Sequence, residues 1–208
     1  MTMPSVTRPS RSTRKERRDA MEQRVIAAAE QLVTDGESFT ELSVERLAAV
    51  AGISRSTFYV HFEDKGDLAR RATRAVAAEV EEVSDTWWSV AHLANQDQLR
   101  TALSALIDLY RRRGAAFTMM SEAGTYDTGV AEEVGSLMKR LIDTTRQAIE
   151  RGLAAGVMRP VEPKETAAVL TWMVERVGYQ LLRQTDPSGH DKVADVLADI
   201  IWSTLYKN

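Results

Sequence analysis

The chain has 208 residues and a formal net charge of −3 at pH 7, with 44% hydrophobic and 27% charged residues, which is typical of a globular protein. It contains no Cys, which excludes disulfides, thiolate metal ligands and cysteine nucleophiles. No stretch approaches the roughly 18 uncharged apolar residues of a membrane helix, and the N-terminal end has no apolar signal region, so we expect a cytoplasmic protein.

The N-terminal end of the chain is basic although the whole chain is slightly acidic. Residues 1–78 carry 13 Lys and Arg against 11 Asp and Glu, whereas residues 79–208 carry 14 against 19. In the first 24 residues, Glu16, Asp19 and Glu22 oppose Arg8, Arg11, Arg14, Lys15, Arg17, Arg18 and Arg24. A basic end on an acidic body is typical of a protein that binds an anion through that end. A solvated, disordered tail has the same composition, so the charge alone leaves both alternatives open.

Nearly all of the chain after residue 13 has the periodicity of helices. Residues 1–13 are rich in Pro, Ser, Thr and Arg and are predicted to form a disordered basic arm. Apolar residues then recur every three or four positions, which predicts a helix that ends near Gly36 and further helices at 44–50, 55–61, 64–88, 96–113, 115–122, 128–155, 163–185 and 190–206. No stretch shows the alternation of apolar and polar residues that is typical of a β-strand. We therefore predict an all-α protein of about nine helices, with a three-helix head at 14–63 and a larger helical body at 64–208.

The segment AGISRSTFYVHF, residues 51–62, has the pattern of a helix-turn-helix. Gly52 allows the positive φ of a tight turn, and Ser54 is an N-cap for a helix whose first N–H groups suit a phosphate. Phe58 and Phe62, four residues apart, are predicted to pack inward. The remaining faces of this helix show side chains that all form hydrogen bonds and of which none is acidic: Arg55, Ser56, Thr57, Tyr59 and His61. An ordinary solvated corner is the alternative, but such a face usually mixes Glu and Lys, which are absent here, so the pattern favours DNA binding.

The run LSVERLAAVAGISRSTFYVHFEDKGDL, residues 42–68, closely resembles the helix-turn-helix signature of the TetR family of bacterial regulators. The resemblance implies that the helix at 55–61 reads the major groove. On that basis base edges are met by Arg55, Ser56 and Thr57, phosphates by Ser43, Ser54, Tyr59, His61 and Lys65, and the basic arm adds Arg14, Lys15, Arg17 and Arg18. Ser56 stands where relatives often have Gly, which bears on the local approach to the groove and not on the fold. A weaker similarity at Trp172–Arg176 and in the segment DIIWSTLY points to a mycobacterial member of the family.

Motifs of catalytic and metal sites are absent from the sequence. We find no G-x-S-x-G, no G-x-x-x-x-G-K-[ST], no G-x-G-x-x-G and no H-E-x-x-H. The spacing of His61, His92 and His190 does not indicate a shared metal ion. We therefore predict a protein that is not an enzyme and that has neither a cofactor nor a metal.

Large apolar and aromatic side chains are concentrated in the body. At helical spacing about half of them are expected to belong to a core rather than to a ligand pocket. A pocket is favoured because the aromatic residues cluster at helix junctions and because Tyr and Trp have a polar tip that needs a partner when buried. The candidate ligand-binding residues are Trp87, Trp88, Leu106, Tyr110, Phe117, Met120, Tyr126, Met138, Trp172, Glu175 and Tyr179, with Thr171 and Gln180 as further polar candidates. The ligand expected for such a pocket is a hydrophobic or aromatic molecule of moderate size.

The last two predicted helices, at about 163–185 and 190–206, have apolar stripes that are wider than one core contact requires. An excess apolar face on the final helix pair is expected to form a four-helix interface with a second copy of the chain. A wide core within one chain is the alternative.

Together these features predict a ligand-responsive transcriptional regulator. The hypothesis is a repressor that binds a palindromic DNA operator as a homodimer and is released by a small apolar or aromatic effector, without contact with a membrane. The helix at 64–88 spans roughly 37 Å and would connect the DNA-binding head with the aromatic cluster. Two alternatives are a non-specific architectural DNA-binding protein and a helical interaction module without DNA binding. The acidic body argues against the first, and the donor-rich face at 55–61 argues against the second.

Overall fold

The computed structural model describes residues 11–207, and helices make up most of that range. The α-helices are α1 (Arg11–Thr34), α2 (Val44–Val50), α3 (Arg55–His61), α4 (Lys65–Trp88), α5 (Gln96–Arg112), α6 (Gly114–Ala123), α7 (Thr128–Ala154), α8 (Pro163–Arg176) and α9 (His190–Leu205). Short 3-10 turns lie at Ala91–Leu93, Leu182–Gln184 and Pro187–Gly189, and a π-helical turn lies at Val177–Leu181. The β-type pairing of the described residues is limited to an isolated bridge between Met158 and Tyr206. Within residues 11–207, no helix has the length and apolar character that a membrane span requires.

The prediction of an all-α protein with about nine helices is confirmed, but two boundaries differ. α1 begins at Arg11, so the last three residues of the predicted arm are helical, while residues 1–10 of that arm lie outside the described range. The helix predicted at 163–185 ends as α8 at Arg176, and the π-helical and 3-10 turns follow it.

Side chains at the helix starts explain most of the boundaries. Ser43 caps α2 and Ser54 caps α3, each accepting a hydrogen bond from the backbone N–H three residues further on. The long helices begin in the same way, with Asp64 at α4, Asn95 at α5 and Asp127 at α7. Between α2 and α3, Gly52 has a φ of +63°, which favours glycine and lets the chain turn as predicted.

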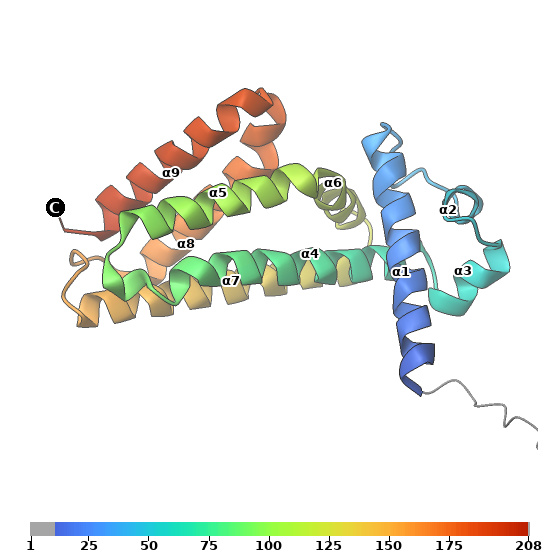
Figure 1. The fold of residues 1–208 in the computed structure, drawn as a ribbon, viewed down its shortest axis with the longest axis horizontal. Helices are drawn as coiled ribbons and strands as arrows, with labels where there is room; N and C mark the ends of the chain where they lie inside the picture. Colours follow the sequence, from blue (N-terminus) through green and yellow to red (C-terminus); the bar gives the residue numbers. More distant parts are fainter. Residues whose placement is uncertain (1–10, 208) are drawn as a thin grey trace, which may run out of the picture.

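Figure 1 shows α1 crossing one end of an elongated helical body, with α2 and α3 on the far side of α1. α4 and α7 run along the length of this body and pack against each other. α5 contacts α4 and α9, and α8 contacts α7. α6 packs against both α1 and α4, so α6 joins the three-helix head to the body.

The described residues form two apolar cores that meet along α4. The head core contains Phe39, Phe58 and Phe62 and continues into α4 as far as Ala72. The body core begins at Val76, one turn further along α4, and includes both tryptophans at the end of that helix. The predicted domain boundary between residues 63 and 64 falls in the turn before α4, whereas the head core extends beyond it.

Ion pairs fix the first turns of α4 to the helices on both sides. The guanidinium of Arg71 bonds Glu22 of α1 at 2.6 Å and Asp67 of its own helix at 2.9 Å. Nη1 of Arg70 lies 2.8 Å from Oδ2 of Asp127, which caps α7. Burial raises the pKa of Asp67 and Asp127, but hydrogen bonds from arginine and backbone N–H groups outweigh burial and hold both pKa values below the ordinary value. Both carboxylates are therefore charged near neutral pH, so Asp127 pairs with Arg70 between α7 and α4, and Asp67 holds the Arg71 side chain that also bonds Glu22 of α1.

The turn between α1 and α2 is held by Lys65, the first residue of α4. Its Nζ donates to the carbonyl oxygens of Phe39 at 2.9 Å, Thr40 at 2.6 Å and Leu42 at 3.0 Å. An ammonium group has three N–H donors, so these bonds use all of them. Lys65 thus fixes the segment that leads into the helix-turn-helix.

Replacing Lys65 with Met keeps a long unbranched side chain and removes the ammonium group. The three carbonyl oxygens then lose their donor, and we expect the free energy of unfolding to fall by about 1–3 kcal/mol. Urea unfolding followed by circular dichroism measures this, with the exposed Lys164→Met on α8 as the matched control. A loss no larger than that of the control would contradict the role of Lys65.

Candidate functional site

α3 presents a polar face outward and anchors itself with two aromatic side chains. Phe58 and Phe62 are buried in the head core, with ring centroids 5.2 Å apart. On the other side, the Ser54 hydroxyl lies 2.8 Å from the hydroxyls of both Ser56 and Thr57. The predicted base-reading and phosphate residues of α3 are exposed or half-buried on that side: Arg55, Ser56, Thr57, Tyr59 and His61. The face therefore carries hydrogen-bonding groups of the kind that read a DNA groove.

The guanidinium of Arg55 is held by a residue that sequence reasoning missed. It pairs with the carboxylate of Glu45 on α2 and lies 5.6 Å from the centroid of the Tyr59 ring. Both charged side chains are more than half exposed, and such ion pairs contribute about 0–1 kcal/mol. A DNA base could therefore replace Glu45 as the partner of the Arg55 guanidinium at a small cost in free energy. Local sequence gives no signal for this pair, because it joins two helices across the turn.

The basic residues at the start of α1 are exposed. These residues are Arg14, Lys15, Arg17 and Arg18, and Nε of Arg18 lies 2.9 Å from Oε1 of Glu22. In Figure 1 the start of α1 lies at the end of the head that is nearer to α3 than to α2. A groove bound by α3 would therefore bring its phosphates towards this basic segment.

Lys65 is placed differently from the prediction that it contacts a phosphate. Its three donors are bound to the α1–α2 turn, so a phosphate contact would have to break one of these bonds. We therefore assign Lys65 to positioning this turn. Ser43 is exposed at the start of α2, where its Oγ accepts the capping hydrogen bond and its hydroxyl proton is free to meet a phosphate.

A cavity of about 140 Å³ lies inside the body, between α4, α5, α6, α7 and α8. Ten predicted ligand-binding residues line it: Trp87, Trp88, Leu106, Tyr110, Phe117, Met120, Met138, Trp172, Glu175 and Tyr179. Tyr126 does not, because it lies in the α6–α7 turn near Asp127 and is 47% exposed. Gln180 is exposed and also lies outside the lining, whereas Thr171 is part of it.

α7 contributes lining residues that sequence reasoning missed. These are Val134, Leu137, Leu141 and Thr145, which flank Met138 at helical spacing. The same spacing identifies the buried side of any amphipathic helix. It would therefore have identified these residues as buried, but it does not distinguish the lining of a cavity from a packed core.

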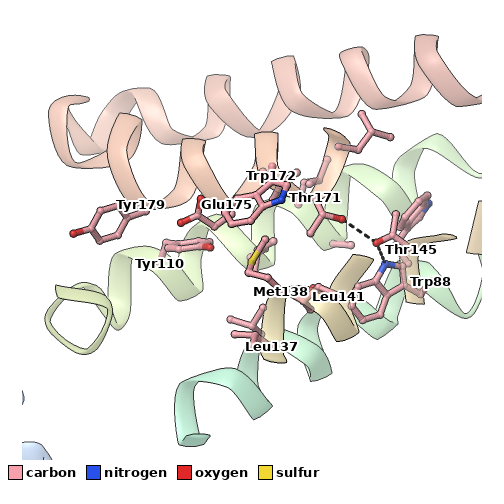
Figure 2. A pocket seen from close by; sticks show the side chains of 18 of the residues that line it. Trp88, Tyr110, Leu137, Met138, Leu141, Thr145, Thr171, Trp172, Glu175 and Tyr179 are labelled. Carbon is pink, nitrogen blue, oxygen red and sulfur yellow. Dashed lines mark hydrogen bonds between the residues drawn. The ribbon is translucent and has the colours of Figure 1, made fainter. Parts of the chain in front are cut away.

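The polar groups of the cavity lie at its two ends, as Figure 2 shows. At one end Nε1 of Trp88 donates to Oγ1 of Thr145 at 3.0 Å, and Thr171 donates to the same oxygen at 3.4 Å. At the other end are Tyr110 and Glu175. Burial raises the pKa of Glu175, against the opposing effect of Arg176, and burial together with the charge of Glu175 raises the pKa of Tyr110. The middle of the cavity is apolar apart from the indole nitrogen of Trp172.

The π-helical turn after α8 shapes the Tyr110 end of the cavity. Within it Gly178 is buried, and a Cβ at this position would lie 2.5 Å from Cδ2 and Cζ of Tyr110. On its other side the Tyr110 ring stacks on Phe117, with centroids 4.2 Å apart and an interplanar angle of 22°. The ring is therefore held between a backbone and a second ring. Single π-helical turns of this kind occur frequently at functional sites.

Two family models match the chain. A model described as "Bacterial regulatory proteins, tetR family" matches residues 25–72, which include α2 and α3. A model described as "Transcriptional regulator EthR, C-terminal domain" matches residues 99–207, slightly more than half of the chain. The second match contains most of the helices that enclose the cavity.

Individual relatives agree with these matches. The HTH-type transcriptional regulator EthR of Mycobacterium tuberculosis is 26% identical over 198 residues, which cover 90% of this chain and 88% of that protein. The crystal structure of the TetR family regulator PfmR from Thermus thermophilus has a TM-score of 0.70 at 20% identity, over 88% of this chain and 100% of that one. A SmeT–triclosan complex has a TM-score of 0.72 at 17% identity, over 91% and 93% of the two chains. At these identities the two structures show the fold alone.

Replacing Gly178 with Ala should force the Tyr110 ring out of its place. Because the ring is also stacked on Phe117, we expect the free energy of unfolding to fall by about 1–3 kcal/mol. Gly135→Ala is the matched control, since its Cβ would meet nothing within 4 Å on α7, and a helical Gly→Ala change there should stabilise by up to about 1 kcal/mol. Urea unfolding of the two variants compares them, and equal stability would contradict the packing of Tyr110 on Gly178.

Proposed function

Because the chain belongs to the TetR family of bacterial regulatory proteins, we propose that it is a cytoplasmic repressor that binds a palindromic operator as a homodimer and is released by a small apolar or aromatic ligand. The family consists of transcriptional regulators, so this protein is a regulator and not an enzyme. The observation that carries the proposal is α4, a single helix of 24 residues that starts beside the DNA-binding head and ends at the cavity wall with Trp87 and Trp88.

The outward face of α3 supports binding in the major groove. Arg55 stands at the start of that helix, where it can reach a base edge, and Tyr59 follows one turn later, where it can reach the backbone. In a dimer two such helices would enter successive major grooves about 34–36 Å apart. This spacing makes binding sensitive to the angle between the two heads.

The exposed apolar side chains support dimerisation through α8 and α9. Large hydrophobic residues are exposed on these helices and on the π-helical turn between them: Val169, Trp172, Leu181, Val196 and Ile200. Apolar patches of this kind on a soluble protein mark interfaces. Two copies joined by these helices would form a four-helix contact with two-fold symmetry.

The cavity supports control by a ligand. A molecule that enters beside Trp88 would push on α4 and change the position of the head at the other end of that helix. Release from DNA requires the ligand to bind the unbound spacing of the heads more tightly than the DNA-bound spacing, with a coupling free energy of about 1–3 kcal/mol. The related fold of SmeT has been crystallised with triclosan, an instance of a ligand in a protein of this architecture.

The DNA-binding proposal is tested by Arg55→Ala. A selection from random duplexes first identifies the preferred site. If Arg55 reads a base edge, its removal should weaken binding to that site by about 1–3 kcal/mol and leave binding to random DNA nearly unchanged. The exposed Arg140→Ala on α7 is the matched control, measured by fluorescence anisotropy at one fixed salt concentration.

Equal losses on the preferred site and on random DNA would show that Arg55 is not a base reader. A selection that returns no preferred sequence would favour the architectural DNA-binding alternative. Absence of salt-dependent binding to any duplex would favour the helical interaction module.

The dimer is tested by Ile200→Asp. Ile200 lies on the exposed face of α9, and a buried unpaired carboxylate at an interface is strongly unfavourable. We expect the wild type to sediment as a dimer at micromolar concentration and the variant as a folded monomer. Leu93→Asp, at an exposed apolar position in the Ala91–Leu93 turn and not on α8 or α9, should leave the dimer intact. A monomeric wild type would overturn the proposed interface.

A further inference from the structure

The size of the cavity limits what can enter it without rearrangement. Its volume is about 140 Å³. Cavities of about 150 Å³ in protein interiors take up one benzene molecule. The space therefore accommodates one ring with a short substituent and excludes a long chain or a fused ring system, unless the lining side chains move.

One carboxylate in the lining has an open acceptor. Among residues 11–207, Oε2 of Glu175 is shielded from solvent and has no hydrogen-bond partner, and Nε of Arg176 lies 3.6 Å away from it. The Arg176 side chain is itself mostly exposed, so water competes for it. A buried acceptor that is left unpaired has lost its bonds to water without replacement, which destabilises the empty cavity. A ligand that donates a hydrogen bond to Oε2 would recover this free energy.

Three of the other polar groups of the lining bond one another. The hydroxyls of Thr145 and Thr171 bond each other, and Trp88 bonds Thr145. The indole nitrogen of Trp87 has no hydrogen bond of good geometry, but it faces the hydroxyl of Tyr206. Among the described lining atoms that are shielded from solvent and lack a hydrogen bond, Oε2 of Glu175 is the acceptor.

We propose that the effector is a single-ring apolar molecule carrying a hydrogen-bond donor, an amine or a hydroxyl, which Glu175 accepts. The ring lies in the apolar middle of the cavity beside Met138 and Trp172, and its donor points to the Tyr110 end (Figure 2). The inference rests on the proposed function, because it takes the cavity as the effector site. Burial raises the pKa of Glu175, and an amine cation at Oε2 would favour the charged carboxylate again.

Three probes of the same shape distinguish the contribution of the hydrogen-bond donor to binding from that of the ring. Ethylbenzene, benzyl alcohol and benzylamine have the same skeleton and differ only in the terminal group. Calorimetric titration gives the dissociation constant of each for the wild type, for Glu175→Leu and for Glu175→Gln. Glu165→Leu, at an exposed position in the first turn of the same helix, is the matched control.

Glu175→Leu should weaken the binding of benzyl alcohol and benzylamine by about tenfold or more. The binding of ethylbenzene should be unchanged or tighter, because ethylbenzene has no donor for the carboxylate and meets an apolar side chain in the variant. Glu175→Gln retains an acceptor oxygen, so relative to Glu175→Leu it should restore the binding of benzyl alcohol more than that of benzylamine. Glu165→Leu should change none of the three. Thermal unfolding verifies that each variant is folded.

Each contrary result has its own meaning. Equal losses for all three probes in both Glu175 variants would show a purely structural role of Glu175 and overturn the proposal. Binding of all three probes without an effect of Glu175 would also overturn it, and no binding by any probe would overturn the size class as well. None of these titrations contains DNA, so the proposed function fails separately, if a molecule that binds the cavity leaves operator affinity unchanged.

Discussion

α4 is packed into two apolar cores at once, and this constraint governs the relation between the two ends of the molecule. Leu68 and Ala72 lie in the core of the head, whereas Val80 and Trp88 lie in the core of the body. A helix satisfies its backbone hydrogen bonds internally and moves as a unit, about 36 Å long for its 24 residues. Under the proposed function, a displacement at Trp88 would be transmitted along α4 to the head as a rotation.

The charges around α4 decide how such a rotation is resisted. Arg70 and Arg71 tie its first turns to α7 and α1, and partly buried pairs of this kind are costly to leave unpaired. A second ion pair links the Tyr110 end of the cavity to the head. Arg113 follows Tyr110 by three residues, and its Nη2 lies 3.0 Å from Oε1 of Glu30 on α1. The head is thus held by ion pairs from both α4 and the α5–α6 junction. A movement of the head relative to the body would change both sets of ion pairs.

The head could be predicted from sequence because its structure is encoded by short-range signals. Ser43, Gly52 and Ser54 each fix one local feature, a cap or a turn, and each occurs where the sequence places it. The cavity could be predicted in part, because aromatic residues at helix junctions leave packing gaps. The interaction of Lys65 with carbonyl oxygens more than twenty residues earlier could not, because nothing near Lys65 in the sequence indicates where its ammonium group points.

The π-helical turn and the position of Tyr126 escaped prediction for related reasons. Apolar spacing continues from α8 through Leu182, so the periodicity alone predicts one helix. The structure instead has a π-helical turn where the ring of Tyr110 packs on Gly178. These two residues are far apart in the sequence. Tyr126 has the same residue type as the lining tyrosines, but it precedes the cap of α7 and faces outward. Apolar spacing and residue type alone do not distinguish these positions.

Trp172 connects the cavity with the apolar surface of α8 and α9. Its side chain lines the cavity, and it is also 47% exposed on the face proposed for dimerisation. A second copy on that face would cover the outer side of the same ring whose inner side meets the ligand. The Trp172 ring would then take part in both ligand binding and the dimer contact, so each could affect the angle of α4. A ligand favours one arrangement of the two heads only to the extent that it binds the cavity of that arrangement more tightly. Under the proposed function, the cavity would therefore act on DNA through the geometry of the pair of chains, not through contact with the DNA-binding helix.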